Sequence, residues 1–270
     1  MRLAALVAFA VAALPLPALA SICYAFVEGV PGVRYASLEL ATAAPEVRIS
    51  FVGHSTYRIE SPEGVVANTD YFGADGIGGV PDIVTMNNAH STHWTANPNP
   101  EIDHVLTGWN PDGDGPIEHK LTMADMTVRN VTTDIRNWGT PREDGNSIFV
   151  FEVADLCIGH LGHLHHPLTE QQYALLGRID ILMLPIDGSF TLNLGQMIEI
   201  AKRLKSSLVL PMHAFGEASM QRFLSGMADA FVVRYGDAVL DVSIESLPSQ
   251  PTVLVMPPTQ YLSRGSLGID

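Results

Sequence analysis

Apolar and polar residues alternate over short stretches in the first half of the chain, and Gly, Pro, Asp and Ser separate these stretches. Such alternation is typical of strands with one buried face, and the separating residues favour turns. Residues 94–120 are rich in Pro, Asn, Asp and Gly, which predicts a long surface loop around one short strand. The pattern predicts strands at residues 47–52, 56–60, 64–68, 82–86, 104–107, 126–132, 147–153 and 156–161.

A helical period appears in the second half. Residues 194–204 place apolar side chains at helical spacing, and helices are also predicted at residues 168–176 and 219–227. Residues 179–184 and 207–212 are almost wholly apolar, as expected of strands that are buried on both faces. Strands followed by helices predict an α/β fold that is built as an αββα sandwich.

Residues 1–20 have the features of a signal peptide. Arg2 is positively charged, an apolar stretch continues to Leu16, and Ala18-Leu19-Ala20 is a small-x-small cleavage sequence. We therefore expect an exported protein, periplasmic or secreted, with residues 21–270 as a single domain.

The chain is acidic, with 15 Lys and Arg against 29 Asp and Glu and a formal net charge of −14. This balance argues against a nucleic-acid partner or an anionic membrane surface, because both require a basic face. A small-molecule substrate remains compatible, even an anionic one, since a bound metal can dominate the local field. The sequence does not specify an oligomeric state.

Cys23 and Cys157 are the two cysteines of the chain. In an exported protein they could form a disulfide that ties the mature N-terminus to the core. The alternative, which the apolar surroundings of Cys157 favour, is that it is a buried small hydrophobic residue. Ile22 is too bulky for a lipidation signal before Cys23, so we expect no membrane association after signal cleavage.

Six of the ten histidines fall in two short clusters, at residues 88–93 and 160–166. Each cluster follows a predicted strand, and His213 ends the apolar run 208–212. Imidazole is a common ligand for zinc and similar metals, and side chains at neighbouring strand ends can converge on one ion. The clusters therefore predict a metal site.

Several segments, taken in order along the chain, resemble the metallo-β-lactamase superfamily. They are a strand that ends in Gly53-His54-Ser55, a strand end at Asp70, the hairpin 145–162, and the apolar strands that run to Gly188 and His213. The resemblance covers about residues 46–227. It is strongest to the branch of zinc-dependent hydrolases that includes ascorbate-6-phosphate lactonase-like proteins, and it implies the same αββα fold.

The metal motif of that family, His-x-His-x-Asp-His, is altered here. It is written Asn88-Ala89-His90-Ser91-Thr92-His93, with Asn88 for the first His and Thr92 for the Asp. His163 stands where the family has a bridging Asp. The metal ligands that the resemblance implies are His90, His93, His163 and His213, with His54, Asp134, His165 and His166 as further candidates.

Three other residues have simpler interpretations. His54 is equally consistent with a ligand and with a histidine bonded to the backbone. His160, at the end of an apolar strand, is predicted to be a structural residue, and Asp187 is predicted to be a turn residue.

The replacement of carboxylates affects both metal number and mechanism. In the family, the Asp of the motif orients and deprotonates the attacking water, whereas the Thr92 hydroxyl can hold a water but cannot act as a base near neutral pH. Thr92 and Asn88 are the candidate catalytic residues. Because imidazole at position 163 removes negative charge, we expect one divalent transition metal, with zinc as the first choice.

These observations predict an exported hydrolase of a small ester, lactone or phosphoester, in which a metal-activated water attacks the substrate. A fold does not determine a function, so two alternatives stay open: a non-catalytic periplasmic metal-binding or sensing protein on the same fold, and a degenerate fold that is used only for interaction.

Overall fold

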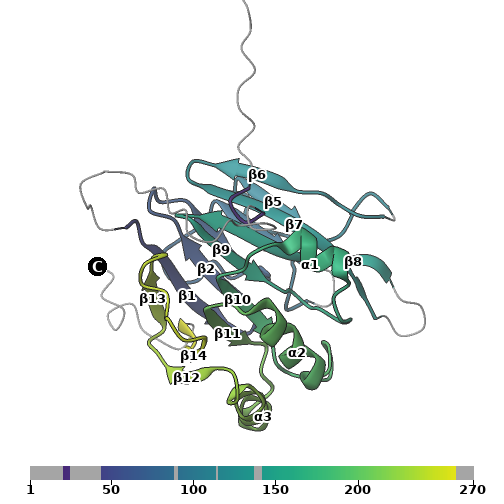
Figure 1. The fold of residues 1–270 in the computed structure, drawn as a ribbon. Coiled ribbons are helices and arrows are strands. Elements are labelled where there is room, and N and C mark those ends of the chain that lie inside the picture. The colour runs from purple at the N-terminus through teal and green to yellow at the C-terminus, as the bar shows by residue number, and fades with distance from the viewer. Residues whose placement is uncertain (1–20, 25–43, 88–90, 114, 137–141, 260–270) are drawn as a thin grey trace, which may run out of the picture.

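Two β-sheets packed face to face form the centre of the molecule (Figure 1). The computed structural model describes residues 21–24, 44–87, 91–113, 115–136 and 142–259. The predicted signal peptide lies outside these residues. No helix in these ranges is long and apolar enough to cross a membrane.

The first sheet has six strands in the order β13-β1-β2-β3-β4-β5. Its strands β13, β1, β2 and β3 pair antiparallel, and β3, β4 and β5 pair parallel. The strands are β1 (Val47–Gly53), β2 (Thr56–Glu60), β3 (Val66–Asn68), β4 (Ile83–Met86), β5 (His104–Thr107) and β13 (Val239–Val242).

The second sheet has eight strands in the order β12-β14-β11-β10-β9-β8-β7-β6. The strands from β12 to β9 run parallel, and those from β9 to β6 pair antiparallel. The strands are β6 (Lys120–Met123), β7 (Met126–Ile135), β8 (Arg142–Val153), β9 (Leu156–His160), β10 (Ile181–Pro185), β11 (Leu208–Met212), β12 (Val232–Tyr235) and β14 (Thr252–Val255).

Three helices pack on the outer face of the second sheet: α1 (Glu170–Leu176), α2 (Leu194–Leu204) and α3 (Glu217–Met227). The side chains of Thr169 and Asn193 cap the first turns of α1 and α2 by accepting backbone hydrogen bonds. The helices and this sheet share one apolar core, and the two sheets share another.

Strand β8 shows how one strand serves both cores. Ile148 and Val150 point toward the helices, while Phe149 and Phe151 point into the space between the sheets. Successive side chains of a strand point to opposite faces, so the part of a strand that lies between two cores is apolar on both faces. The same rule explains the continuous apolar runs of β10 and β11.

The predicted α/β sandwich is confirmed. In the described part of the chain, the helices cover only the eight-stranded sheet, because the elements that precede α1 are all strands. The α2 helix and strands β2 and β5 have the bounds that the sequence pattern predicted. Strands β6, β12, β13 and β14 were not predicted from the pattern.

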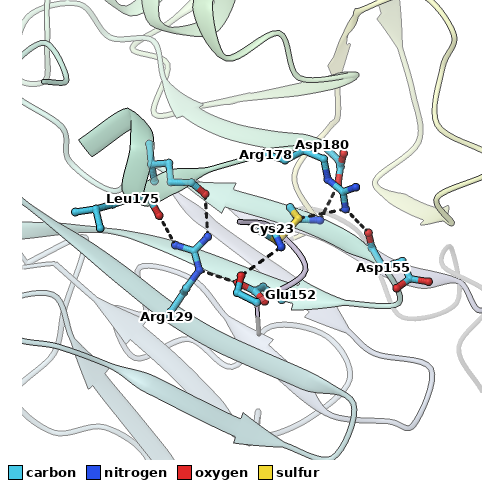
Figure 2. Close-up of a disulfide and its surroundings, with 10 residues drawn as sticks. Cys23, Arg129, Glu152, Asp155, Leu175, Arg178 and Asp180 are labelled. Carbon is cyan, nitrogen blue, oxygen red and sulfur yellow. Dashed lines mark hydrogen bonds and ion pairs between the residues drawn. A yellow bond between two sulfur atoms is a disulfide. The ribbon is translucent and has the colours of Figure 1, made fainter. Parts of the chain in front are cut away.

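Cys23 and Cys157 form a disulfide, with their Cα atoms 5.9 Å apart (Figure 2). The favoured interpretation of Cys157 as an unbridged hydrophobic residue was therefore wrong. The reason lies in tertiary packing: the Cys23 carbonyl accepts a hydrogen bond from the Arg178 amide at 2.9 Å, which brings the N-terminal segment against β9.

Further contacts hold the segment 21–24 on the sheet. The Ser21 hydroxyl donates to the Glu152 carboxylate at 2.5 Å, and the Arg129 guanidinium lies 4.3 Å from the Tyr24 ring centroid. Arg129 also forms a buried ion pair with Glu152 and donates to the carbonyl of Leu175 at the end of α1 (Figure 2). The first residues after the predicted cleavage site thus belong to the folded domain.

Replacing both cysteines with serine is expected to lower the free energy of unfolding by about 2–4 kcal/mol, because the bridge closes a very long loop in the unfolded chain. The measurement is the urea midpoint of the wild type and the double variant. A reducing agent should lower the wild-type midpoint to that of the double variant and leave the variant unchanged. A wild-type midpoint that reductant does not move would contradict the prediction.

Candidate metal centre

Three histidines from distant parts of the chain meet at one edge of the sandwich. His54 lies in the β1–β2 turn, His93 follows β4, and His213 directly follows β11. One ring nitrogen from each lies within 4.8 Å of the other two. His93 and His213 are almost completely buried, and His54 is half-buried, so the group faces solvent on one side.

The backbone places His54 and His213 side by side. The amide of His213 donates to the carbonyl of His54 at 2.7 Å, and the ring centroids are 4.2 Å apart. Both residues have positive φ, 53° and 54°. Such conformations are costly for residues with a side chain and often occur at functional sites.

Asp70 orients His93. Its carboxylate lies 2.6 Å from His93 Nδ1 and accepts a second hydrogen bond, at 2.7 Å, from Asn87. Burial alone would raise the pKa of the Asp70 carboxyl, but its interactions with His93 and His160 and its hydrogen bonds hold that pKa below the usual value. An ionised Asp70 accepts the Nδ1 proton, so Nε2 is the His93 nitrogen that can serve as a metal ligand.

Asp187 holds His213 in a similar way, with 3.2 Å between its Oδ1 and His213 Nδ1. The carboxylate also accepts hydrogen bonds from the backbone amides of Ser189, Phe190 and Thr191 and from the Thr191 hydroxyl. Burial alone would raise the pKa of Asp187, but the bonds from His213, Thr191 and the backbone hold it far below its usual range. Metal-binding histidines commonly have a carboxylate on the other ring nitrogen.

His163 lies beside this group but is oriented by another histidine. Its ring centroid is 4.7 Å from that of His93 and 5.2 Å from that of His213. On the other side, His163 Nδ1 lies 2.5 Å from His165 Nε2, and His165 Nδ1 accepts the backbone amide of Arg136 at 2.6 Å.

This chain of hydrogen bonds determines which nitrogen of His163 carries the proton. Because His165 Nδ1 accepts an N–H, the proton of His165 is on Nε2, and it is donated to His163 Nδ1. A neutral His163 then carries its own proton on Nε2. In this form, His163 offers an N–H rather than a lone pair, unlike the bridging carboxylate of the family.

The loop that carries His163 is packed too tightly for a side chain at Gly162. This glycine has a φ of 57°, and a Cβ there would collide with the side chains of Asn87 and Asn146. Asn146 in turn accepts the backbone amide of His163 at 2.8 Å. The buried side-chain amides of Asn87 and Asn146 thus support the site, as the carboxylates of Asp70 and Asp187 do.

His160 is a structural residue, as the sequence predicted. Its Nδ1 accepts the amide of Gly162 at 3.1 Å, and its Nε2 therefore donates to the carbonyl of Ser55 at 2.8 Å. Burial lowers the pKa of His160.

The remaining candidates from the sequence have varied positions. Thr92 Oγ1 lies 2.9 Å from His54 Nε2. Asp134 is exposed and accepts the backbone amide of Asp144 in the β7–β8 ladder, and His166 is half-buried. Asn88 and His90 lie outside the described residues, so their predicted roles remain predictions.

Two carboxylates of the site were not predicted from the sequence. Asp187 is a turn residue, as expected, but it also contacts His213. Asp70 was noted only as a strand end that resembles the family. Both follow the ends of buried strands of the sheets, β10 and β3, and this position is the signal that identifies them.

The sequence matches the family model described as the beta-lactamase superfamily domain over residues 48–213, which is more than half of the chain. The chain belongs to the metallo-β-lactamase superfamily. The matched residues run from β1 to His213 and include His54, His93 and His163. No curated protein sequence matches the chain.

Two solved structures share this metallo-β-lactamase fold. A Thermotoga maritima protein, provisionally described as a zinc-dependent hydrolase of the superfamily, is 23% identical with a TM-score of 0.57 and aligns with 78% of this chain and 98% of its own. A provisionally described metal-dependent hydrolase from Parabacteroides distasonis is 14% identical with a TM-score of 0.55, covering 68% and 90% of the two chains. These likenesses show the fold. The narrower resemblance to ascorbate-6-phosphate lactonase-like proteins stays a prediction.

The hydrogen-bond chain through His165 predicts the tautomer of His163. In metal-free protein, nitrogen-15 NMR of the ring should show the proton of neutral His163 on Nε2, because His165 donates to Nδ1. The His165→Phe variant removes this donor and should let the proton move to Nδ1. A wild-type His163 that is protonated on Nδ1 would contradict the prediction.

Proposed function

We propose that the protein is a metal-dependent hydrolase that holds one divalent transition metal, most readily zinc, at His54, His93 and His213. The observation that carries the proposal is the convergence of the three ring nitrogens within 4.8 Å of one another. Three histidines with an open position form a recognised catalytic zinc arrangement.

The charge around the site supports a single metal. Asp70 and Asp187 are buried, and the pKa of each carboxyl is held below its usual range, so two negative charges lie behind the three histidines. One divalent cation balances these two charges. A second cation would need a further carboxylate, and the residue in the position of the bridging Asp is His163.

When bound, the metal would supply a Lewis acid and an activated water. The side chains of the protein would position the water and stabilise negative charge on the substrate. Thr92, through its hydroxyl beside His54, can position a water by hydrogen bonding, and His163 can direct its Nε2 proton toward negative charge that develops on the substrate. The substrate class that we propose is a small ester, lactone or phosphoester.

Export to the periplasm or the cell exterior is part of the proposal. The Cys23–Cys157 disulfide supports it, because such bonds persist mainly in oxidising compartments. A second function, non-catalytic metal binding or sensing, is favoured by one observation. Thr92 replaces the carboxylate that serves as the base in the family.

Alanine at His93 or His213 is expected to abolish most metal binding, from about one equivalent of zinc in the wild type. Asp70→Asn should weaken zinc binding by about 10–100-fold, because the partner that orients His93 becomes a poorer acceptor. Elemental analysis and competition with a chelating dye measure both effects. His119→Ala is the matched control, since His119 bonds to the Thr107 carbonyl instead. Two tightly bound equivalents in the wild type would contradict the single-metal site.

Thr92→Asp is expected to increase hydrolysis of an activated ester by about tenfold or more, because positioned general bases contribute roughly 10²–10⁴-fold. Thr92→Asn is the matched control, because Asn has the same size as Asp but its side-chain amide cannot act as a base. Metal content is measured with the rate, since the new carboxylate could recruit a second ion.

Two results would change the assignment. If the wild type and Thr92→Asp both bind metal and leave esters, lactones and phosphodiesters uncleaved, the protein is a metal-binding or sensing protein. If the wild type is active and both substitutions slow it, the Thr92 hydroxyl takes part in an altered hydrolytic mechanism.

A further inference from the structure

A cavity of about 370 Å³ opens beside two of the three histidines, His54 and His213. Apart from these two, its described lining is apolar and comes from β1, α3, the end of β11 and the segment after β14. The apolar residues that line it are Phe51, Pro211, Met212, Ala214, Met220, Met256 and Pro258.

The chemistry of this lining limits what the cavity can bind. Among the described lining residues there is no Lys, Arg, Asp or Glu, and the two imidazoles are the polar side chains. Away from the two imidazoles, a phosphate or a sugar would find no charged or hydrogen-bonding side chain among the described residues of the wall. An apolar group needs none, and it would replace ordered water there at a gain in free energy.

Two aromatic residues extend the apolar surface beyond the cavity. The side chains of Phe190 and Phe215 are 59% and 52% exposed, and their rings meet edge to face at 5.5 Å. The Phe215 ring lies 5.0 Å from that of His213. Exposed aromatic pairs beside a polar centre commonly mark a binding surface.

The aromatic rim is held in place by the same residues that hold the histidines. The Phe190 amide donates to Asp187, which also contacts His213. The Arg136 guanidinium donates to the carbonyls of Phe190 and Thr191 at 3.3 and 2.6 Å. A backbone that is fixed before binding loses little entropy when a ligand arrives.

We propose that the cavity binds an apolar chain, and that the substrate is a neutral ester or lactone that carries such a chain next to its carbonyl. This inference rests on the proposed hydrolase function and narrows its substrate class, setting phosphoesters aside. In hydrolysis, the water oxygen bonds to the acyl carbon, the acyl C–O bond breaks, and the departing oxygen takes a proton. The methionines of the wall adapt their shape readily, so chains of several lengths should fit.

The first test is a series of p-nitrophenyl esters from acetate to decanoate with zinc-loaded protein. The value of kcat/KM should rise by up to about fourfold per methylene, the transfer gain of a buried CH₂, and level off when the cavity is full. A kcat/KM that is independent of chain length would overturn the proposal.

A pair of variants on α3 shows whether the chain lies in this cavity. Met220→Glu places a charge in the wall, whereas Gln221→Glu adds the same charge at the next, exposed position of the helix. The first should remove the gain with chain length, lowering kcat/KM for the long-chain esters far more than for acetate, and the second should change neither the preference nor the rate. Equal behaviour of the two variants would exclude the cavity.

Binding without catalysis separates this inference from the hydrolase function. Octanamide, which serves as an uncleaved ligand, should shift the NMR signals of the Met220 and Met256 methyl groups, and acetamide should not. If the methyl signals shift but no ester is cleaved, the cavity is correct and the hydrolase function fails. If esters are cleaved without any shift, the hydrolase function stands and the apolar site is wrong.

Discussion

A backbone hydrogen bond from the amide of His213 to the carbonyl of His54 joins the two sheets at the edge where the site forms. It connects the β1–β2 turn of the first sheet to the end of β11 in the second. Both residues adopt positive φ to make it, so the turn and the strand end must bend toward each other. A second link, from the Tyr57 hydroxyl to the Pro211 carbonyl, lies in the core just behind it. The separation of the two imidazoles therefore depends on how the sheets pack.

Buried charge is the second constraint on this edge. A buried carboxylate is tolerated only when hydrogen bonds or cations compensate it, and Asp70 and Asp187 each obtain several donors from nearby segments. Those donors are backbone amides and side chains of the strand-end loops. The loops are consequently ordered around the carboxylates, and the histidines are ordered with them. A divalent cation would complete this arrangement electrostatically.

Much of the fold could be predicted because its elements have local patterns. The α2 helix has apolar residues at helical spacing behind the Asn193 cap, and β10 and β11 are continuous apolar runs. Strands β12–β14 have four residues each and are partly exposed, so pairing with distant strands, rather than local alternation, defines them. The disulfide was not expected for the same reason, since residues far apart in the sequence bring Cys23 to Cys157.

The site, like the fold, could be predicted from the sequence only where neighbouring residues in the chain determine it. His93 and His213 follow strand ends, a position that the sequence shows, whereas the role of His163 depends on His165 and on the Arg136 amide, which only the folded chain brings together. Arg136 also holds the carbonyls beside Phe190. One residue of the β7 end therefore sets both the proton position of His163 and the aromatic rim of the cavity. Polar and apolar recognition at this edge are consequently coupled through Arg136.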